Sequence, residues 1–280
     1  MIIALYFNET KPKARNIAIS VREFLVSHGV TVVVADEQAG IIDAQPLSSI
    51  DPKSVDFIIS MGGDGTILKT VHRFPDLQAP VLGINLGSLG FMADIPTSDI
   101  YPSLQDLLDG AYRVQERIMM KGRTVSGEEC FAVNDIVIHR SHNPTLIDLA
   151  IHVDGIYLNT FSADGMIAAT PTGSTAYSLA AGGPIITPEI EAFALTPISP
   201  HTVSNRPLIL MPNNEIQIQL LSECQPIEIS VDGQAEFSMH SGDVFHIQRS
   251  DRRFRLISLL RHDYFSTLRS KLGWSGKLRH

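Results

Sequence analysis

Residues 1–35 are MIIALYFNETKPKARNIAISVREFLVSHGVTVVVA, and they decide the fold of the N-terminal part of the chain. The apolar run from Ile2 to Phe7 predicts a buried strand, and the β-branched run from Thr31 to Ala35 predicts a second one. Between these runs, apolar residues recur at the spacing of one helical face, and Gly29 is placed to end that helix: Ala14, Ile17, Ala18, Val21, Phe24 and Leu25. A strand–helix–strand opening predicts a parallel sheet and an α/β domain.

The pattern changes after about residue 115, where short strand-like runs follow one another without long helices. Turn pairs separate some of the runs, among them Asp154-Gly155 and Asp232-Gly233. The predicted strands are 132–139, 147–153, 156–161, 216–221, 227–231, 244–248 and 254–260. We therefore expect an α/β domain over 1–115 and an all-β sandwich over 116–262. One helix-compatible run, 175–181, interrupts these strands. A helix over 264–272 is expected in the tail, where 263–280 packs back on the first domain.

The composition sets broad limits on function. The chain has 280 residues, of which 44% are hydrophobic, which is enough for a sizeable core. A net charge of −8 argues against non-specific nucleic-acid binding, which needs a basic face. No apolar run approaches the ~20 residues that a membrane-spanning helix needs. The two cysteines, Cys130 and Cys224, are far apart and form no metal motif, so we expect reduced thiols in a cytoplasmic protein.

The first chemical motif is GGDGT at 62–66, between the predicted strand 56–60 and a helix-compatible run over 67–72. Glycines let the backbone approach a ligand closely, and N–H groups at a helix start bind phosphate oxygens. The motif lacks the third glycine of a dinucleotide fingerprint, and Leu68 stands where a Walker A loop requires glycine. Asp64 would repel phosphate unless it has a chemical role, and the alternative is an ordinary turn aspartate.

The second motif is TPTGSTAYS at 170–178, which AGGP follows at 181–184. Small and hydroxylated residues in such number make a poor core strand but suit a backbone that lies against a ligand. Tyr177 offers an aromatic face to a base or ribose. The alternative is a polar loop with a helix N-cap at Ser174 or Thr175.

Together these motifs resemble the NAD kinase family. The order is GGDGT at 62–66, Gly83 to Phe91, Asn134-Asp135, TPTGSTAYS with GGP behind it, and DGQ at 232–234. The resemblance implies a Rossmann-like N-terminal domain, a C-terminal β-sandwich and a homodimer or homotetramer. It also implies a phosphotransferase that moves the γ-phosphate of ATP to the 2′-hydroxyl of the adenosine ribose of NAD.

The resemblance also implies roles for the first motif. Asp64 would act as the base or orienting group for the 2′-hydroxyl, which is a poor nucleophile by itself. Gly63, Gly65 and Thr66 would cradle phosphates, with Mg²⁺ bridging ATP oxygens and no protein ligand assigned to the metal. Lys69 would offset phosphate charge, or it is an ordinary solvated lysine.

On the NAD side, the resemblance assigns Asn134 and Asp135 to adenosine and Asp164 to the nicotinamide end. A strand bulge is the alternative for the first two, and a turn is the alternative for Asp164. The NAD pocket would include Thr175, Ala176, Tyr177, Ser178, Leu179 and Ala180. Gln234 would contact the dinucleotide from the late loop, with a plain hairpin turn as the alternative.

One position departs from the family pattern, and some alternatives stay open. Many members carry Arg or Lys where this chain has Ser162, so we expect a preference for NAD over NADH here.

A lipid kinase shares the GGDGT loop, and a non-catalytic NAD(H) sensor would keep the pocket. The missing GxGxxG disfavours a dehydrogenase. Inorganic polyphosphate is an alternative phosphoryl donor to ATP.

Overall fold

The computed structural model describes residues 1–11, 13–201 and 206–274, and the chain divides into two compact units. The first unit comprises Met1–Glu116 and the segment that starts at Arg255, and the second comprises Arg117–Phe254. The long strands β7 (Tyr112–Arg123) and β18 (Val244–Leu259) contribute residues to both units. Each unit is described by itself.

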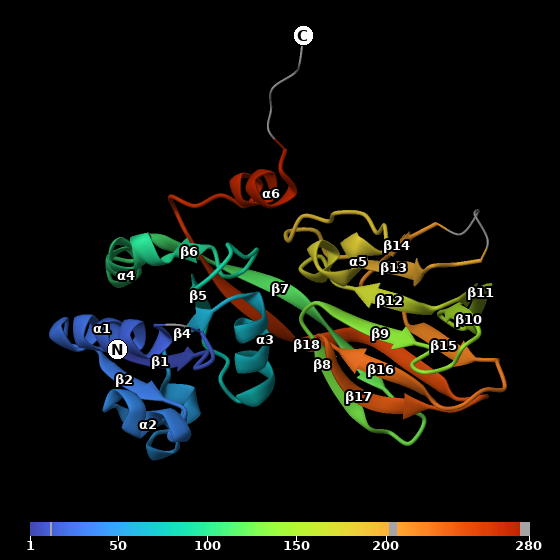
Figure 1. Cartoon of the computed structure of the whole chain (residues 1–280), viewed down its shortest axis with the longest axis horizontal. Helices are drawn as coiled ribbons and strands as arrows, with labels where there is room; N and C mark the ends of the chain where they lie inside the picture. Colours follow the sequence, from blue (N-terminus) through green and yellow to red (C-terminus); the bar gives the residue numbers. More distant parts are fainter. Residues whose placement is uncertain (12, 202–205, 275–280) are drawn as a thin grey trace, which may run out of the picture. The chain divides into compact units, whose positions relative to one another are not determined.

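The first unit contains a parallel sheet in the order β5-β4-β1-β2-β3 (Figure 1). Ile3 pairs with Val32 on one side and with Phe57 on the other, both in parallel register. Short strand β6 and the end of β18 also pair with β5 in parallel. The strands are β1 (Ile2–Phe7), β2 (Thr31–Val34), β3 (Gln45–Pro46), β4 (Phe57–Gly62), β5 (Val81–Asn85) and β6 (Ile95–Pro96). The parallel α/β prediction is confirmed.

Five α-helices belong to the described part of the first unit: α1 (Ala14–Ser27), α2 (Asp36–Ile42), α3 (Asp64–Arg73), α4 (Ile100–Leu108) and α6 (Tyr264–Leu272). Helix α1 buries Ala14, Ala18, Val21 and Leu25, as its spacing predicts. The predicted tail helix also has the observed bounds. Helix α2 was not predicted, because its seven residues are too few for a clear helical period. No described helix combines the length and apolarity that crossing a membrane requires.

The second unit contains two antiparallel sheets. One has the order β11-β10-β15-β18, with β7 pairing to β18 and β8, and the other has the order β14-β13-β12-β9-β16-β17. The strands of the first, besides β7 and β18, are β8 (Glu129–Ala132), β10 (Ile147–Val153), β11 (Ile156–Ala163) and β15 (Ile216–Leu220). Those of the second are β9 (Asp135–His139), β12 (Gly165–Ala169), β13 (Phe193–Ile198), β14 (Leu208–Leu210), β16 (Ile227–Val231) and β17 (Gln234–Met239).

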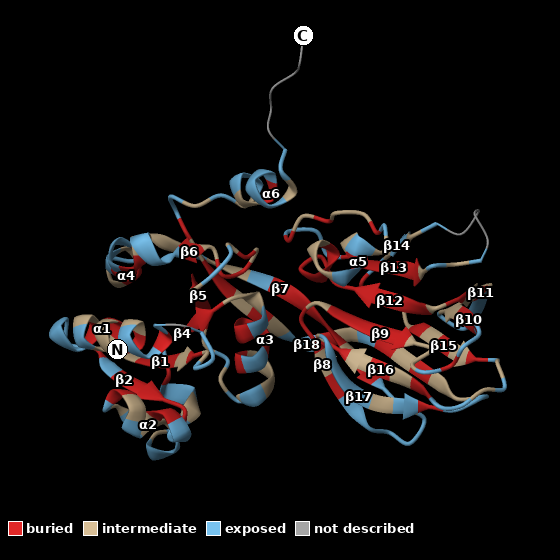
Figure 2. Cartoon of the chain, in the orientation of Figure 1, coloured by how far each residue is buried: buried red, intermediate tan, exposed pale blue. Residues whose placement is uncertain are grey.

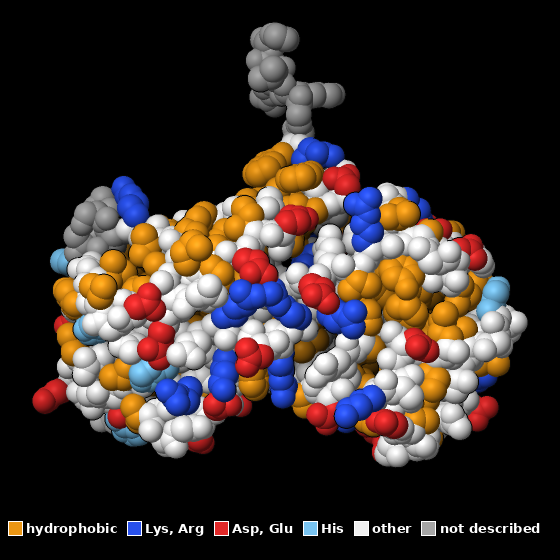
Figure 3. Space-filling view, turned by 180° about the vertical axis from the view of Figure 1, so that it is seen from behind, with side chains coloured by type: hydrophobic (Ala, Val, Ile, Leu, Met, Phe, Trp, Pro, Cys, Tyr) orange, Lys and Arg blue, Asp and Glu red, His pale blue; other side chains and the backbone are white. Residues whose placement is uncertain are grey.

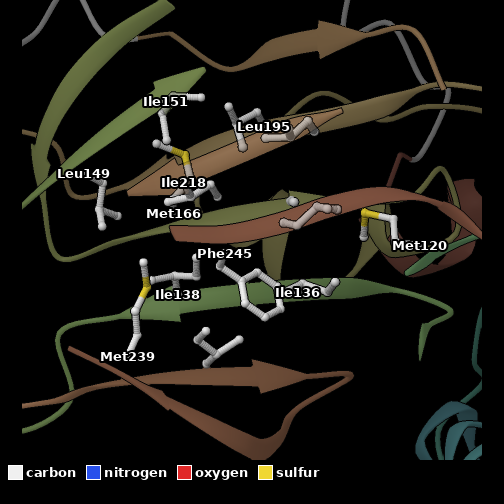
Figure 4. Close-up of a cluster of buried hydrophobic side chains, with 14 of the residues drawn as sticks. Met120, Ile136, Ile138, Leu149, Ile151, Met166, Leu195, Ile218, Met239 and Phe245 are labelled. Atoms are coloured by element: carbon white, nitrogen blue, oxygen red, sulfur yellow. The ribbon is translucent and has the colours of Figure 1, made fainter. Parts of the chain in front are cut away.

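Apolar side chains from both sheets meet in one core (Figure 4). Ile138 and Met166 come from one sheet, and Leu149, Ile218 and Phe245 come from the other; all are almost completely buried. Figure 2 shows the same pattern, with the ribbons of β9, β12 and β13 largely buried. Two packed sheets with alternating inward side chains form a sandwich. The predicted fold class, a Rossmann-like domain and a β-sandwich, is therefore confirmed.

Three sequence-based element boundaries were wrong. The predicted strand 132–139 breaks at Val133 and Asn134, since β8 ends at Ala132 and β9 begins at Asp135. The runs 244–248 and 254–260 form the single strand β18, because its central charges find partners: Arg249 and Arg253 pair with Glu191. The helix-compatible run 175–181 is shorter, with a 3₁₀ turn at Gly173–Thr175 followed by α5 (Tyr177–Ala180).

Both predicted turn pairs are observed. Asp154 and Gly155 have φ of 52° and 76° between β10 and β11, and Asp232 and Gly233 have φ of 49° and 79° between β16 and β17. Two consecutive residues at positive φ form the tight turn whose twist matches antiparallel strands.

On the visible face of Figure 3, Asp and Glu side chains are interspersed with Lys and Arg.

Candidate functional site

The GGDGT motif forms the junction between β4 and α3. Gly62 ends the strand, and Asp64 is the first residue of the helix, with Gly63 as its N-cap. The hydroxyl of buried Thr66 accepts the N–H of Gly63 at 3.3 Å. A Cβ on Gly62 would lie 2.1 Å from that hydroxyl oxygen, so only glycine fits where the strand turns into the helix.

The Asp64 carboxylate is held by the backbone of a second loop. It accepts the N–H of Phe91 at 2.8 Å on Oδ2 and those of Met92 and Ala93 at 3.0 and 2.8 Å on Oδ1. A Cβ on Gly90 would lie 2.0 Å from Oδ1, so the loop approaches Asp64 as closely as glycine permits. Asp64 therefore lies at the start of α3 and holds a loop far away in the sequence.

The other predicted phosphate-binding residues gather on the same helix start. A Cβ on Gly63 or Gly65 would meet no heavy atom within 4 Å, and neither residue has positive φ. The chain itself therefore does not require glycine at these two positions. Lys69 is exposed one turn further along α3. The N–H groups of a first helical turn have no intrahelical partner, so this end of α3 is suited to an anion.

A separate cavity of about 610 Å³ lies within the second unit. It is lined by Asn134, Asp135, Val137, His139, Arg140, Ser141, Asp164, Ala176, Tyr177, Ile198, Ser230, Asp232 and Gly233. Five of the predicted NAD-binding residues thus come together there: Asn134, Asp135, Asp164, Ala176 and Tyr177. The cavity lining does not include Thr175, Ser178, Leu179, Ala180 or Gln234. Ser178 is instead buried, with its hydroxyl 3.0 Å from that of Thr196.

Asp232 fixes the corner between β8 and β9. Its carboxylate accepts the backbone N–H groups of Val133, Asn134 and Asp135 at 2.9, 2.7 and 3.1 Å. This carboxylate explains why the predicted strand breaks at that point, since three successive N–H groups turn toward one acceptor. The side-chain Oδ1 of Asn134 is buried with no hydrogen-bond partner among the described residues. Such an acceptor is costly unless a ligand or water donates to it.

Asp135 is 4% exposed, and its environment disfavours a charge. Burial, reinforced by the negative charge of Asp232, raises the pKa of the Asp135 carboxyl to about 7. At neutral pH this group is therefore partly protonated and able to donate as well as accept a hydrogen bond.

The sequence analysis missed the residues after Asp135 that line the cavity. Asp135, Val137 and His139 alternate along β9 and share a face, so a period of two counted from Asp135 could have found His139. His139 Nε2 lies 2.9 Å from Glu228 Oε1, and its Nδ1 accepts the N–H of Ser141 at 3.2 Å. No local pattern pointed to Arg140.

Arg140 supplies a positive charge to this cavity. Its Nε donates to Asp164 Oδ1 at 2.6 Å, its Nη1 donates to the carbonyl of Asn143, and its backbone N–H donates to the carbonyl of Asp164 at 2.9 Å. Ser162, where relatives were expected to carry a cation, lies in β11 opposite Asp148 and is not part of the lining. The cation beside Asp164 therefore comes from the residue that follows β9 and not from position 162 in β11.

Family profiles match both parts of the chain. The ATP-NAD kinase N-terminal domain matches residues 3–112, and the ATP-NAD kinase C-terminal domain matches residues 133–259. The chain belongs to the ATP-NAD kinase family. The NAD kinase resemblance drawn from the motifs is thereby confirmed.

Individual NAD kinases are similar over nearly the whole length. The NAD kinase of Protochlamydia amoebophila is 56% identical over 278 residues, which are 99% of this chain and 100% of that protein. The NAD kinase of Geotalea daltonii is 39% identical, covering 97% of this chain and 98% of that one.

Two solved structures of the NAD kinase fold are also similar. A yeast NADH kinase complexed with NADH has a TM-score of 0.87 at 29% identity, covering 100% of this chain and 89% of that one. An NAD kinase from Archaeoglobus fulgidus in complex with ATP has a TM-score of 0.76 at 25% identity, covering 99% of this chain and 100% of that one.

Proposed function

We propose that this chain is an NAD kinase, which transfers the γ-phosphate of ATP to the 2′-hydroxyl of the adenosine ribose of NAD. The observation that carries the proposal is its 56% identity to an NAD kinase over 99% of the chain, with Asp64 present in the GGDGT motif. The similar solved structures hold NADH in one case and ATP in the other, which supports a dinucleotide and a nucleotide as ligands.

The start of α3 is the proposed phosphate site. The space beside Gly63 and Gly65 is open, the N-terminus of the helix attracts anions, and Lys69 provides a nearby positive charge. Thr66 supports this turn through its bond to Gly63. These glycines let phosphate oxygens reach the backbone N–H groups without obstruction by a Cβ.

Asp64 is the proposed catalytic carboxylate. It would accept the proton of the 2′-hydroxyl while that oxygen forms a bond to the γ-phosphorus and the bond from the γ-phosphorus to the bridging oxygen of ADP breaks. Three backbone donors already occupy its oxygens. The hydroxyl must therefore use a remaining lone pair, or the loop must release one of its bonds.

The cavity of the second unit is the proposed dinucleotide site. The unpartnered Oδ1 of Asn134 and the partly protonated carboxyl of Asp135 offer an acceptor and a donor to adenosine. Tyr177 is 47% exposed and offers a ring face, and Asp164 would bind the nicotinamide end. We propose that Thr175, Ser178, Leu179, Ala180 and Gln234 complete and support this pocket.

Mg²⁺ is the proposed metal ion. The described residues contain no group of three or more His, Cys, Asp or Glu side chains that could hold a metal by themselves. Mg²⁺ usually retains waters and binds through nucleotide phosphates with few protein ligands, so the phosphates of ATP would hold the proposed ion. When bound, the ion would neutralise charge on the phosphate oxygens.

We also propose a homodimer or homotetramer. Edge strands β11 and β14 expose apolar side chains on the second unit: Ile156, Tyr157, Leu158, Leu208 and Ile209. An exposed apolar edge strand is a common site of association. Light scattering coupled to size exclusion would give the mass, and substitution of Ile156 and Ile209 by Lys would lower it.

A cytoplasmic location is proposed as well, since both thiols are free, and cell fractionation tests it.

The activity is tested with the purified chain, NAD, ATP and Mg²⁺, by following NADP with an NADP-specific dehydrogenase. NADP formation that depends on all three components supports an NAD kinase. Binding of NAD without NADP formation would instead indicate a sensor, and phosphorylation of a diacylglycerol or sphingosine would indicate a lipid kinase. Parallel reactions with polyphosphate and with NADH define the donor and acceptor ranges.

A further inference from the structure

The loop that holds Asp64 is itself fastened on two sides. On the inner side, the Asn85 amide donates to the carbonyls of Ser88 and Ala93 at 2.6 and 3.2 Å. Gly90 adds a backbone bond to Ala93 at 2.9 Å. These contacts shape the loop, but they do not connect it to any element outside its own neighbourhood.

On the other side, the loop is connected to the C-terminal segment of the same unit. His262 Nδ1 lies 3.3 Å from Asp94 Oδ2, and its Nε2 lies 3.5 Å from Asp99 Oδ2. Asp94 directly follows Ala93, whose N–H binds Asp64. The imidazole therefore bridges the end of the loop and the start of α4.

Neighbouring residues make this connection rigid. Arg261 donates to Asp99 and Asp106 at 2.5 Å each, and to the buried hydroxyl of Ser103 at 2.7 Å. The Phe91 ring lies 6.5 Å from the Tyr264 ring, and Lys271 Nζ lies 5.7 Å from the Phe91 centroid. Three carboxylates, an arginine and an imidazole thus join the segment before α6 to the loop and to α4.

We propose that His262 is a positioning residue for Asp64: by holding Asp94, it fixes the three peptide N–H groups that orient the Asp64 carboxylate. The inference rests on the proposed function, because it assigns His262 to the same reaction. A carboxylate that accepts a hydroxyl proton must keep its oxygens within a few tenths of an ångström of the reactive position. His262 lies outside the motifs and acts only through Asp94.

The charge of His262 agrees with this role. The hydrogen bond to Asp94 raises the pKa of His262, against the opposing effects of burial and of the positive charge of Arg261, while Asp99 raises it further. The protonated form donates from both ring nitrogens, so it can hold both carboxylates at once. As the pH rises through the raised pKa, one donor is lost and the connection weakens.

The test compares His262→Ala, His262→Gln and Asp94→Asn with wild type. We expect His262→Ala to lower kcat by roughly 10- to 100-fold with both KM values within about twofold, since the effect is on orientation rather than binding. His262→Gln retains a donor, so it should recover part of kcat. Its kcat should not decline as the pH rises through the raised pKa of His262, because glutamine does not titrate. His240→Ala is the matched control, because exposed His240 lies 3.6 Å from Asp243 in a histidine–aspartate pair of the second unit.

Coupling to Asp64 separates a positioning effect from general damage. In an Asp64→Asn background, His262→Ala should lower the residual kcat by less than twofold, because no carboxylate is left to orient. If His262→Ala lowers kcat by the same factor in the Asp64→Asn background as in wild type, the inference is overturned. A His262→Ala enzyme with wild-type kcat would also overturn it.

Hydrogen exchange tests the connection without using activity. The amides of 91–93 should exchange at least about tenfold faster in His262→Ala than in wild type, and those of β1 should not change. Unchanged exchange at 91–93 overturns the inference whether or not the enzyme is active. If exchange at 91–93 is faster in His262→Ala but the wild-type chain makes no NADP, the proposed function is refuted and the connection stands.

Discussion

The Asp232 carboxylate accepts the backbone N–H of Asp135 at 3.1 Å, and its charge adds to the burial that raises the pKa of the Asp135 carboxyl to about 7. Asp232 thus shapes the backbone corner at which Asp135 lies, and it also keeps the Asp135 carboxyl partly protonated. This pair places a group with a raised pKa in the lining of the cavity of the second unit.

The first prediction follows from that pKa. Because the folded value of about 7 lies above the unfolded value of 3.8, the native state binds more protons between these limits. Stability should therefore fall as the pH rises from about 4 to about 7. Asp135→Asn should remove this dependence and raise the free energy of unfolding at pH 8 by at most about 4 kcal/mol, since one pKa unit is worth about 1.4 kcal/mol.

Urea unfolding at a series of pH values measures this effect. Asp148→Asn is the control, because it makes the same substitution at an exposed aspartate of the same unit. Equal pH slopes in wild type and Asp135→Asn would contradict the assignment of the raised pKa to this residue.

The second prediction concerns Asp64→Asn. The amide cannot accept the hydroxyl proton, so kcat should fall by ~10²–10⁴-fold. The structure adds a stability effect, because one amide oxygen cannot serve all three N–H donors of 91–93. We expect unfolding to become easier by about 1–3 kcal/mol. Kinetics and thermal unfolding together check both parts, with Asp76→Asn, on an exposed turn, as the control. Activity within a few-fold of wild type would rule out the catalytic assignment.

The third prediction concerns Gly90→Ala. The added Cβ would lie 2.0 Å from Asp64 Oδ1, so either the carboxylate or the loop must move. We expect a kcat loss of at least ~10²-fold and a stability loss of about 1–3 kcal/mol. Gly40→Ala is the control, since its Cβ meets nothing within 4 Å in helix α2. A fully active Gly90→Ala enzyme would show that Asp64 does not need this loop.

The fourth prediction concerns Tyr177→Ala. Tyr177 lines the cavity and is 47% exposed, so its removal should raise the KM for NAD by about 10-fold, as expected for the loss of a stacking contact of about 1 kcal/mol or more. The KM for ATP should change less than twofold. Steady-state kinetics with each substrate varied in turn measures both values. Tyr101→Ala, at a similarly exposed tyrosine of α4, is the control. Equal increases for both substrates would place the dinucleotide elsewhere.

The fifth prediction concerns Arg140→Met. This change keeps the length of the side chain but leaves the Asp164 carboxylate without its cation. We expect weaker NAD binding by about 10- to 100-fold, corresponding to the loss of one charged hydrogen bond. Titration calorimetry with NAD measures the Kd. Arg253→Met, which breaks a similar pair with Glu191, is the control, and an unchanged Kd in Arg140→Met would exclude Arg140 from the site.

Residue patterns predicted most of the fold, because they report burial and backbone conformation. Apolar and β-branched runs found β1 and β2, helical spacing found α1, and Asp-Gly pairs found the hairpins at Asp154-Gly155 and Asp232-Gly233. The breaks near Asn134 and at Ala176, before α5, were missed, since the first depends on a carboxylate contributed by a distant turn. Local patterns carry no information about such a partner.

The sequence by itself determined the family, the two domain types and the positions of two motifs, the glycine-rich GGDGT and the hydroxyl-rich TPTGSTAYS. Only the tertiary structure decided which groups face one another. It joins Asp64 to N–H groups 27–29 residues away, Asp232 to N–H groups 97–99 residues away, and Arg140 to Asp164 across 24 residues. The physical reason is that spacing along the chain specifies which side chains are buried, whereas hydrogen-bond partners are set by strand pairing and loop packing between segments that the sequence separates.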